Sequence, residues 1–260
     1  MILGRIGGTA FTPRWANDAM PELFLRKLRH GAPLQAEDEA LLSCLVQGAR
    51  SYEARADIVP QGSAQRMLSL VLDGWACRYK LLANGRRQIT ALFLPGDLCE
   101  PFGVMPHVVD QGLAALTPAV VASVPLGAVQ DAARRWPRIA EALWWDLLVA
   151  ATLEREHIVS LGRRSASERL GHLFCELHVR LTMVGLADED GFDLPITQSD
   201  LSDLLGLSAV HVNRSLQDLR QTGLLALRGR RLTLYDIDRL RELSLFEPAW
   251  FHPRRSDALP

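Results

Sequence analysis

Five residues between positions 210 and 217 combine side-chain types that can read the edges of DNA bases. The segment after Ser208 has the apolar spacing of a helix, with Val212, Leu216 and Leu219 on its buried face. At about 100° per residue, the other side carries an apolar group, an imidazole, two amides and a guanidinium: Val210, His211, Asn213, Arg214 and Gln217. Guanidinium, amide and apolar groups are those that recognise guanine, adenine and the thymine methyl. The sequence therefore predicts a helix that reads duplex DNA.

A second group of residues could hold the DNA backbone. Free amides and the helix dipole favour an anion at the start of a helix, where Thr197, Gln198 and Ser199 stand, and Ser208 precedes the next helix. Three arginines flank a glycine at the tip of an expected hairpin: Arg228, Arg230 and Arg231. Residues 205–235 contain five arginines and one acid, in a chain whose net charge is −1. We predict that these seven residues contact phosphate.

Two short helices and a hairpin must position these side chains. Thr197 can cap the first helix, because Asp200 completes a capping box, and Gly206 can end it in a left-handed conformation. The apolar stripe of this helix is Leu201, Leu204 and Leu205. Ser208 can cap the second helix. The spacing of a helix-turn-helix also fits, although serine replaces the usual alanine at its second position: Gln198, Ser202, Gly206 and Val212. With the hairpin, this is the layout of a winged helix-turn-helix.

Length and composition fit an intracellular regulator. The 260 residues are 48% hydrophobic, which suffices for one large or two moderate domains. The cysteines are scattered singly, which is typical of reduced, buried thiols: Cys44, Cys77, Cys99 and Cys175. Nearly all the cations are arginines, and the only lysines are Lys27 and Lys80. We find no apolar run long enough for a bilayer and no signal peptide, so we expect a cytoplasmic protein without membrane contact.

Short strands and glycine corners dominate residues 52–125, after a helical segment at 22–50. Glycine recurs at spacings of 12, 11 and 11 residues, at Gly62, Gly74, Gly85 and Gly96, which is typical of a β-sandwich or jelly roll. We expect Asn84-Gly85 to form a two-residue hairpin turn. In the strand before it, Trp75, Cys77 and Tyr79 alternate with Ala76, Arg78 and Lys80, the pattern of a half-buried sheet.

A long helix over 138–161 should follow the roll, because 24 positions pass without Gly or Pro. It is apolar nearly all round, so it must be covered on more than one side. The roll can cover one side and a second copy of the helix the other; the alternative is a single helix buried within one domain. The candidate seam residues are Leu143, Leu147 and Ile158. A helix at 165–184 and a flexible acidic linker, 185–191, would then lead to the winged helix.

The order of roll, long helix and winged helix resembles the Crp/Fnr family of bacterial transcription regulators. The likeness rests on residues 70–98, with the Gly74 and Gly96-Asp97 corners, and on residues 196–216. The resemblance implies an α+β fold with an N-terminal jelly roll as sensor. It also implies a parallel pairing of the long helices in a homodimer that binds a palindrome. The expected parts are helices and roll (1–136), dimerisation helix (137–164), winged helix-turn-helix (165–245) and C-terminal tail (246–260). Arg214 matches the base-reading arginine of the family, whereas Val210 stands where the family has a base-reading glutamate.

Departures from the family pattern concern the effector. Nucleotide-binding members carry a Gly-Glu pair for the ribose, which falls on Glu100-Pro101 here, and an arginine for the phosphate. This chain has no Arg or Lys between Arg87 and Arg134. We therefore expect no cyclic AMP or cyclic GMP in the family manner. The cysteines are too far apart for the N-terminal cluster of iron–sulfur members. We predict no cofactor and no metal site, and the effector is left unassigned.

Other classes of function stay open. Cys77, Cys99 and His107 could serve a haem or redox sensor in the roll, although single Cys and His residues are more often structural. The sequence lacks the histidines that hold the metal in a cupin-type enzyme, and we find no catalytic motif. We therefore expect that the protein is not an enzyme. The winged helix could instead be a protein-interaction module. On the main hypothesis the partners are double-stranded DNA and a second copy, with RNA polymerase as a further candidate.

Overall fold

The computed structural model describes residues 21–65, 67–99 and 107–251. Helices α1 (Glu22–Leu28) and α2 (Ala36–Leu45) precede a roll of two four-stranded sheets and one two-stranded sheet. The first sheet has the order β1-β10-β4-β7: Gln47–Tyr52, Ala119–Pro125, Met67–Asp73 and Leu98–Cys99. The second has the order β2-β9-β5-β6: Asp57–Val59, Gly112–Ala115, Ala76–Leu81 and Arg87–Phe93. Strands β3 (Ala64–Gln65) and β8 (His107–Val108) form the small sheet. The predicted roll is thus present, and it begins at position 47 rather than 52.

The four predicted glycine corners all have positive φ angles, from 74° at Gly74 to 94° at Gly96. At Gly74 a Cβ atom would lie 2.2 Å from the carbonyl oxygen of Pro118, so this corner admits glycine alone without a shift of the backbone. The hairpin after β5 differs from the prediction. The amide of Leu82 donates to the carbonyl of Arg86, which leaves a three-residue loop, Ala83 to Gly85, with Gly85 in the left-handed region.

The β5–β6 sheet is covered on both faces, so the prediction of a half-buried sheet was wrong. Ala76 and Arg78 point into the roll, and Cys77 packs into a core shared with the C-terminal helices. The cysteine prediction was partly wrong as well. Three thiols are buried, as expected, but Cys44 is exposed on α2.

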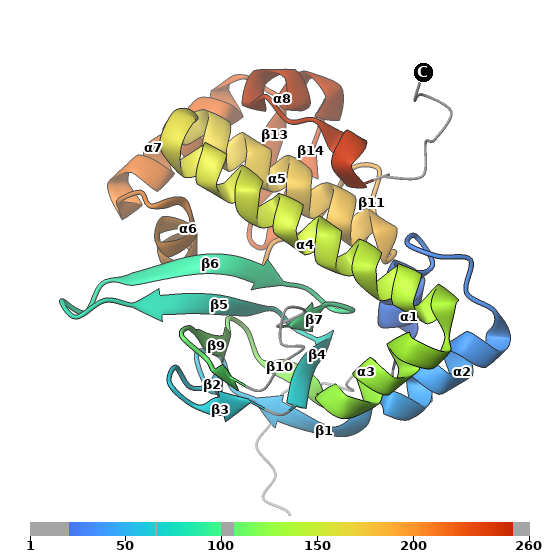
Figure 1. Cartoon of the computed structure of the whole chain (residues 1–260). Coiled ribbons are helices and arrows are strands. Elements are labelled where there is room, and N and C mark those ends of the chain that lie inside the picture. The colour runs from blue at the N-terminus through green and yellow to red at the C-terminus, as the bar shows by residue number, and fades with distance from the viewer. Residues whose placement is uncertain (1–20, 66, 100–106, 252–260) are drawn as a thin grey trace, which may run out of the picture.

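Helix α4 (Pro137–Arg163) is the predicted long helix, and α3 (Leu126–Arg135), which was not predicted, precedes it. Helix α5 (Ala166–Met183) begins at the capping residue Ser165. In Figure 1, α4 and α5 run together along the β5–β6 side of the roll. One apolar core joins residues of β5, β6, α4, α5 and the C-terminal elements. Among the described residues, no helix is long and apolar enough to cross a membrane.

The C-terminal part contains helices α6 (Gln198–Leu205), α7 (Ala209–Gln221) and α8 (Ile237–Ser244), followed by the 3-10 helix η2 (Pro248–Phe251). Its sheet has the order β11-β12-β14-β13: Ala187–Asp188, Gly191–Asp193, Arg231–Leu234 and Leu225–Arg228. The acidic segment 185–191, expected to be a flexible linker, therefore supplies a strand of this sheet and the start of another. We call residues 187–234, from β11 to β14, the reading head.

Candidate nucleic-acid interface

Helix α6 has the predicted capping box at its start. The hydroxyl of Thr197 accepts a hydrogen bond from the Asp200 amide at 3.2 Å, and the Asp200 carboxylate accepts one from the Thr197 amide at 2.9 Å. Gly206 ends the helix with a φ of 64°, as expected. The serine at the usual alanine position is accommodated, because the Ser202 hydroxyl donates to the Gln198 carbonyl at 2.9 Å. The predicted apolar stripe is buried: Leu201, Leu204 and Leu205.

Helix α7 turns its predicted reading face to solvent. Ser208 caps it by accepting a hydrogen bond from the His211 amide at 3.3 Å. Its apolar face is buried, with Val212, Leu216 and Leu219 in the core. All five predicted base-reading residues are exposed: Val210, His211, Asn213, Arg214 and Gln217. A valine that is 76% exposed has no packing role in the described chain, so this face is free for a ligand.

The wing is a two-stranded hairpin of β13 and β14, in which Arg228 pairs with Arg231 and Gly229 has a φ of 60°. Arg228 and Arg230 are exposed at its tip. Arg231 differs, because its guanidinium donates to the Asp188 carboxylate at 2.6 Å. This hydrogen bond holds the pKa of Asp188 below its usual value. Among the residues that the structure describes, the predicted three-cation tip thus has two arginines without an ion pair and one that is already paired.

The three predicted seam residues of α4 lie in different environments. Ile158 is 69% exposed, Leu147 is half-buried, and Leu143 is half-buried against the core formed with α1 and α2. The outward face of α4 also carries Trp144, Leu148 and Val159, which are exposed. Together with Ile158, these residues fall within an arc of about 100° on a helical projection. The structure therefore places one exposed apolar stripe on the helix, in a position that only partly coincides with the predicted seam.

The interior of the roll contains an ion pair that the sequence did not indicate. The Arg78 guanidinium lies 2.9 Å from the Glu154 carboxylate of α4, and its carbon lies 5.4 Å from the centre of the Phe93 ring. The pair borders a cavity of about 90 Å³ between β6, α4 and α5. Glu100 and Pro101 lie outside the described residues, and only the backbone of His107 is described.

The two cysteines proposed for sensing are buried in separate cores. Cys77 belongs to the core shared with the reading head, and Cys99 to the interior of the roll. Burial raises the pKa of the Cys77 thiol to about 12, so the reactive thiolate is scarce at neutral pH. Among the described residues, no group of three or more His, Cys, Asp or Glu side chains could hold a metal ion.

Five charged residues, of which Asp97 and Asp146 are buried and the other three are half-buried, connect the roll with α1, α4 and α5, and the sequence analysis missed them. We call Lys27, Asp97, Asp146, Glu176 and Arg180 the buried charge network. The Lys27 ammonium lies 2.6 Å from Asp97 and 2.5 Å from Asp146. Arg180 lies 2.7 Å from Asp97 and 2.9 Å from Glu176. Burial opposes ionisation of Asp97, but Lys27 and Arg180 outweigh it and lower its pKa.

Comparison with known proteins identifies both halves of this arrangement. Residues 49–135 match the cyclic nucleotide-binding domain, and residues 168–243 match the Crp-like helix-turn-helix domain. The nitrogen fixation regulation protein FixK of Bradyrhizobium diazoefficiens is 32% identical over 176 residues, which cover 67% of this chain and 72% of FixK. The transcriptional activator protein FnrL of Cereibacter sphaeroides is 28% identical over 221 residues, or 83% of this chain and 88% of FnrL.

The fold of this chain is also similar to that of a solved structure. That of FixK2 from Bradyrhizobium japonicum has a TM-score of 0.67 and 29% identity, and the match covers 75% of this chain and 96% of that one. With a roll that matches the cyclic nucleotide-binding domain, a Crp-like helix-turn-helix after it and a relative that is 32% identical, the chain belongs to the Crp/Fnr family of DNA-binding transcription regulators.

Proposed function

We propose that this regulator binds a palindromic operator as a homodimer and reads each half-site with α7. The observation that carries the proposal is the reading face of α7, which is exposed while the opposite face is packed in the core. A recognition helix needs this arrangement to enter the major groove. The first turn of α6 and the tip of the wing flank it with backbone amides and arginines.

Base reading and backbone binding fall to different residues in this proposal. Arg214 contacts a guanine, and Val210, which cannot accept a hydrogen bond, contacts a thymine methyl; His211, Asn213 and Gln217 are further readers. The phosphate contacts come from Thr197, Gln198, Ser199, Ser208, Arg228 and Arg230. Arg231 contributes less than the other wing arginines, because Asp188 already neutralises its charge.

The second copy covers the exposed apolar stripe of α4. The side chains of Trp144 and Ile158 are 71% and 69% exposed, and they lie on one face of a 27-residue helix. Burying each such side chain contributes roughly 1.5–3 kcal/mol, so several pairs would stabilise a dimer. The seam then runs along Trp144, Leu148, Ile158 and Val159, with Leu147 at its margin. Leu143, which packs against the N-terminal core, lies outside it.

The roll does not hold a cyclic nucleotide in the family manner. Inside the roll next to α4, Arg78 lies 2.9 Å from Glu154, and each neutralises the other. No Arg or Lys follows Arg87 until Arg134, so the phosphate would meet no further cation from that segment. Isothermal calorimetry with cyclic AMP should give no heat of binding at micromolar concentrations; saturable binding there would contradict this part of the proposal.

Because a DNA-binding regulator must reach the chromosome, we place the protein in the cytoplasm. RNA polymerase is the proposed partner through which the DNA-bound protein acts on transcription. We assign it no catalytic activity. Selection of binding sites from random duplex DNA tests the central proposal. We expect two inverted half-sites, selected without any added small molecule. Failure to enrich any sequence would leave the winged helix as a protein-interaction module.

A further inference from the structure

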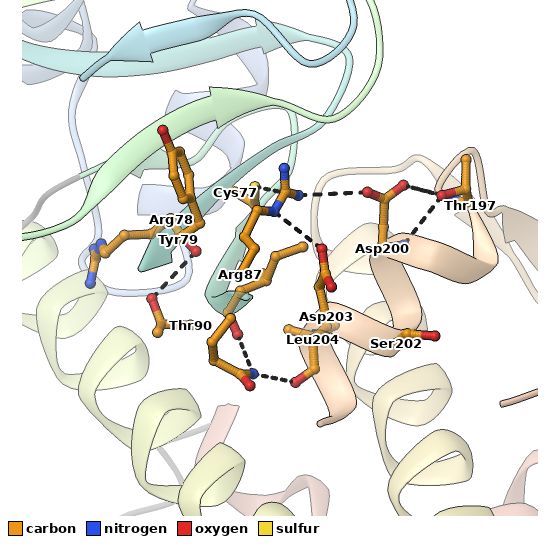
Figure 2. A network of polar contacts seen from close by, with 12 residues as sticks. Cys77, Arg78, Tyr79, Arg87, Thr90, Thr197, Asp200, Ser202, Asp203 and Leu204 are labelled. Carbon is orange, nitrogen blue, oxygen red and sulfur yellow. Dashed lines mark hydrogen bonds and ion pairs between the residues drawn. The ribbon is translucent and has the colours of Figure 1, made fainter. Parts of the chain in front are cut away.

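Arg87, the first residue of β6, lies between the roll and the reading head (Figure 2). Residues of the roll fix its side chain from one side. The guanidinium carbon lies 5.4 Å from the centre of the Tyr79 ring, and Nη2 lies 3.8 Å from the Cys77 sulfur. The Tyr79 hydroxyl in turn donates to Asp57 at 2.8 Å. The guanidinium is thus held in place by β2 and β5 of its own sheet.

The other side of Arg87 faces two carboxylates of α6. Its Nε lies 3.3 Å from Asp203 Oδ2, and its Nη2 lies 3.6 Å from Asp200 Oδ1. The second oxygen of Asp200 belongs to the capping box with Thr197. Next along β6, the side-chain amide of Gln88 donates to the Leu204 carbonyl, near the end of α6, at 3.0 Å. The roll therefore holds α6 at both ends, as Figure 2 shows.

This contact leaves the DNA-facing residues free. The reading face of α7 and the tip of the wing stay exposed while Arg87 is paired, so the contact does not block the interface. Its effect is instead on the orientation of the DNA-facing residues relative to the roll. A dimer that binds a palindrome needs its two reading helices one DNA turn apart, about 34–36 Å. A reading head that moved freely relative to the roll could still bind one half-site. The dimer would then show no preference for one distance between the two half-sites.

We infer that Arg87 is a positioning residue, which ties the first helix of the helix-turn-helix to the sensor roll and so sets the separation of the two reading helices. The inference rests on the proposed homodimer on a palindrome. The electrostatics support a specific requirement for this cation. The Asp200 side chain is only 7% exposed, and burial raises the pKa of Asp203 while Arg87 opposes the rise. Without Arg87, the carboxylates of Asp200 and Asp203 would face the sheet without the cation that now contacts both of them, which would favour separation of α6 from β6.

The test uses Arg87→Ala with Arg86→Ala as its matched control. Both variants lose one cation from the same hairpin, and Arg86 is exposed, with no side-chain ion pair among the described residues. Affinity is measured for the selected palindrome, for the same half-sites moved apart by two base pairs, and for a single half-site. We expect the wild type and Arg86→Ala to prefer the native spacing by at least about tenfold, because a fixed separation rejects the wrong spacing. In Arg87→Ala this preference should fall below about threefold, with single half-site affinity unchanged.

A readout without DNA separates this inference from the proposed function. Spin or fluorescent labels at Leu82→Cys on the hairpin and Gln221→Cys on α7, in a Cys44→Ser background, report the distance between roll and head. The distance distribution should broaden in Arg87→Ala and not in Arg86→Ala. Asp203→Asn, which removes the other end of the contact with little change of shape, should broaden it as well.

Two results would overturn the inference: an unchanged distance distribution in both contact variants, or unchanged spacing preference in Arg87→Ala. A wild-type protein that selects no DNA would overturn the proposed function instead, and the label distances would still decide whether Arg87 holds the head.

Discussion

Arg214 and Arg230 carry the same charge in different surroundings, and their loss should have different effects. Arg214 projects from the middle of α7, whereas Arg230 stands at the tip of the wing. Arg214→Ala should cost about 1–3 kcal/mol of operator binding and relax the preference at one base pair. Arg230→Ala should weaken binding to all sequences alike and reduce the salt dependence by about one phosphate contact. Fluorescence anisotropy on operators with single base changes, at several salt concentrations, measures both.

Arg231→Ala is the control within the wing. Since Asp188 already pairs with Arg231, its removal should change affinity less than removal of Arg230. If Arg214→Ala leaves both affinity and the selected sequence unchanged, α7 is not the reading helix.

His172 gives the fold a dependence on pH. Burial, with the nearby charge of Arg164 next, lowers its pKa from 6.5 to about 3. The carboxylate of Glu156, 3.5 Å away, does not reverse this, because Arg164 binds it at 2.9 Å. The unfolded chain therefore takes up the proton first. The stability that His172 contributes is fully present above pH 6.5 and is lost as the pH falls towards 3.

At pH 5 this loss amounts to about 2 kcal/mol, from 1.36 kcal/mol per pKa unit. The advantage of the wild type over His172→Gln in free energy of unfolding should therefore shrink by about that amount between pH 7 and pH 5. Urea denaturation of both proteins at the two pH values measures it. If the difference in free energy of unfolding is the same at both pH values, His172 takes up a proton in the folded state as readily as in the unfolded chain.

The exposed face of α7 was predictable residue by residue, and the ion pairs that surround the helix-turn-helix were not. Helical periodicity alone separates Val210 and Arg214 from Val212, because one stripe must be buried. Arg87 gave no such signal, since its partners lie more than 100 positions away on another element. The pairing of Arg231 with Asp188, 43 positions away on another strand, was hidden as well. Ion pairs between distant segments depend on tertiary structure, which no local pattern encodes.

Helix α4 should determine the oligomeric state. Leu148→Glu would place a charge in the centre of the proposed seam, where burying it without a partner is costly. We expect a mass near the chain value of 28.9 kDa for this variant by light scattering, and twice that for the wild type at micromolar concentration. Leu82→Glu, beside the hairpin loop, is the matched control, because Leu82 is exposed to a similar extent, and this variant should stay dimeric. A monomeric wild type would contradict the seam.

Most elements follow from capping residues and spacing, and the exceptions have physical reasons. The predicted helix at 165–184 agrees with α5 because Ser165 and Glu168 form a capping box. The hairpin loop has three residues rather than the predicted two, because the turn begins at Leu82 and Gly85 then adopts the left-handed conformation. The acidic segment became β11 and β12 because β14 offers an edge to pair with, and such an edge is a property of the assembled sheet.

The molecule should lose stability as a whole when the buried charge network is broken. Arg180→Met removes the ion-pair partner described for Glu176, and one of the two partners of Asp97, at the junction of roll and helices. An unpaired buried charge costs about 3–5 kcal/mol. Arg239→Met removes an arginine from an exposed ion pair with Glu242 and should cost at most about 1 kcal/mol. Urea unfolding followed by tryptophan fluorescence compares them; equal effects would mean that the network contributes no more than a surface pair.

The burial of Lys27 has a consequence for how the protein can be labelled. Of the two lysines in the chain, Lys27 is enclosed between Asp97 and Asp146, which keep its ammonium protonated and therefore not nucleophilic. Lys80, on β5, is 39% exposed. Every cation of the proposed DNA interface is an arginine, which amine-directed esters do not attack. Among side-chain amines, such a reagent should acylate Lys80 alone, so a dye or a surface tether can be placed on the sensor roll while the interface keeps its full charge.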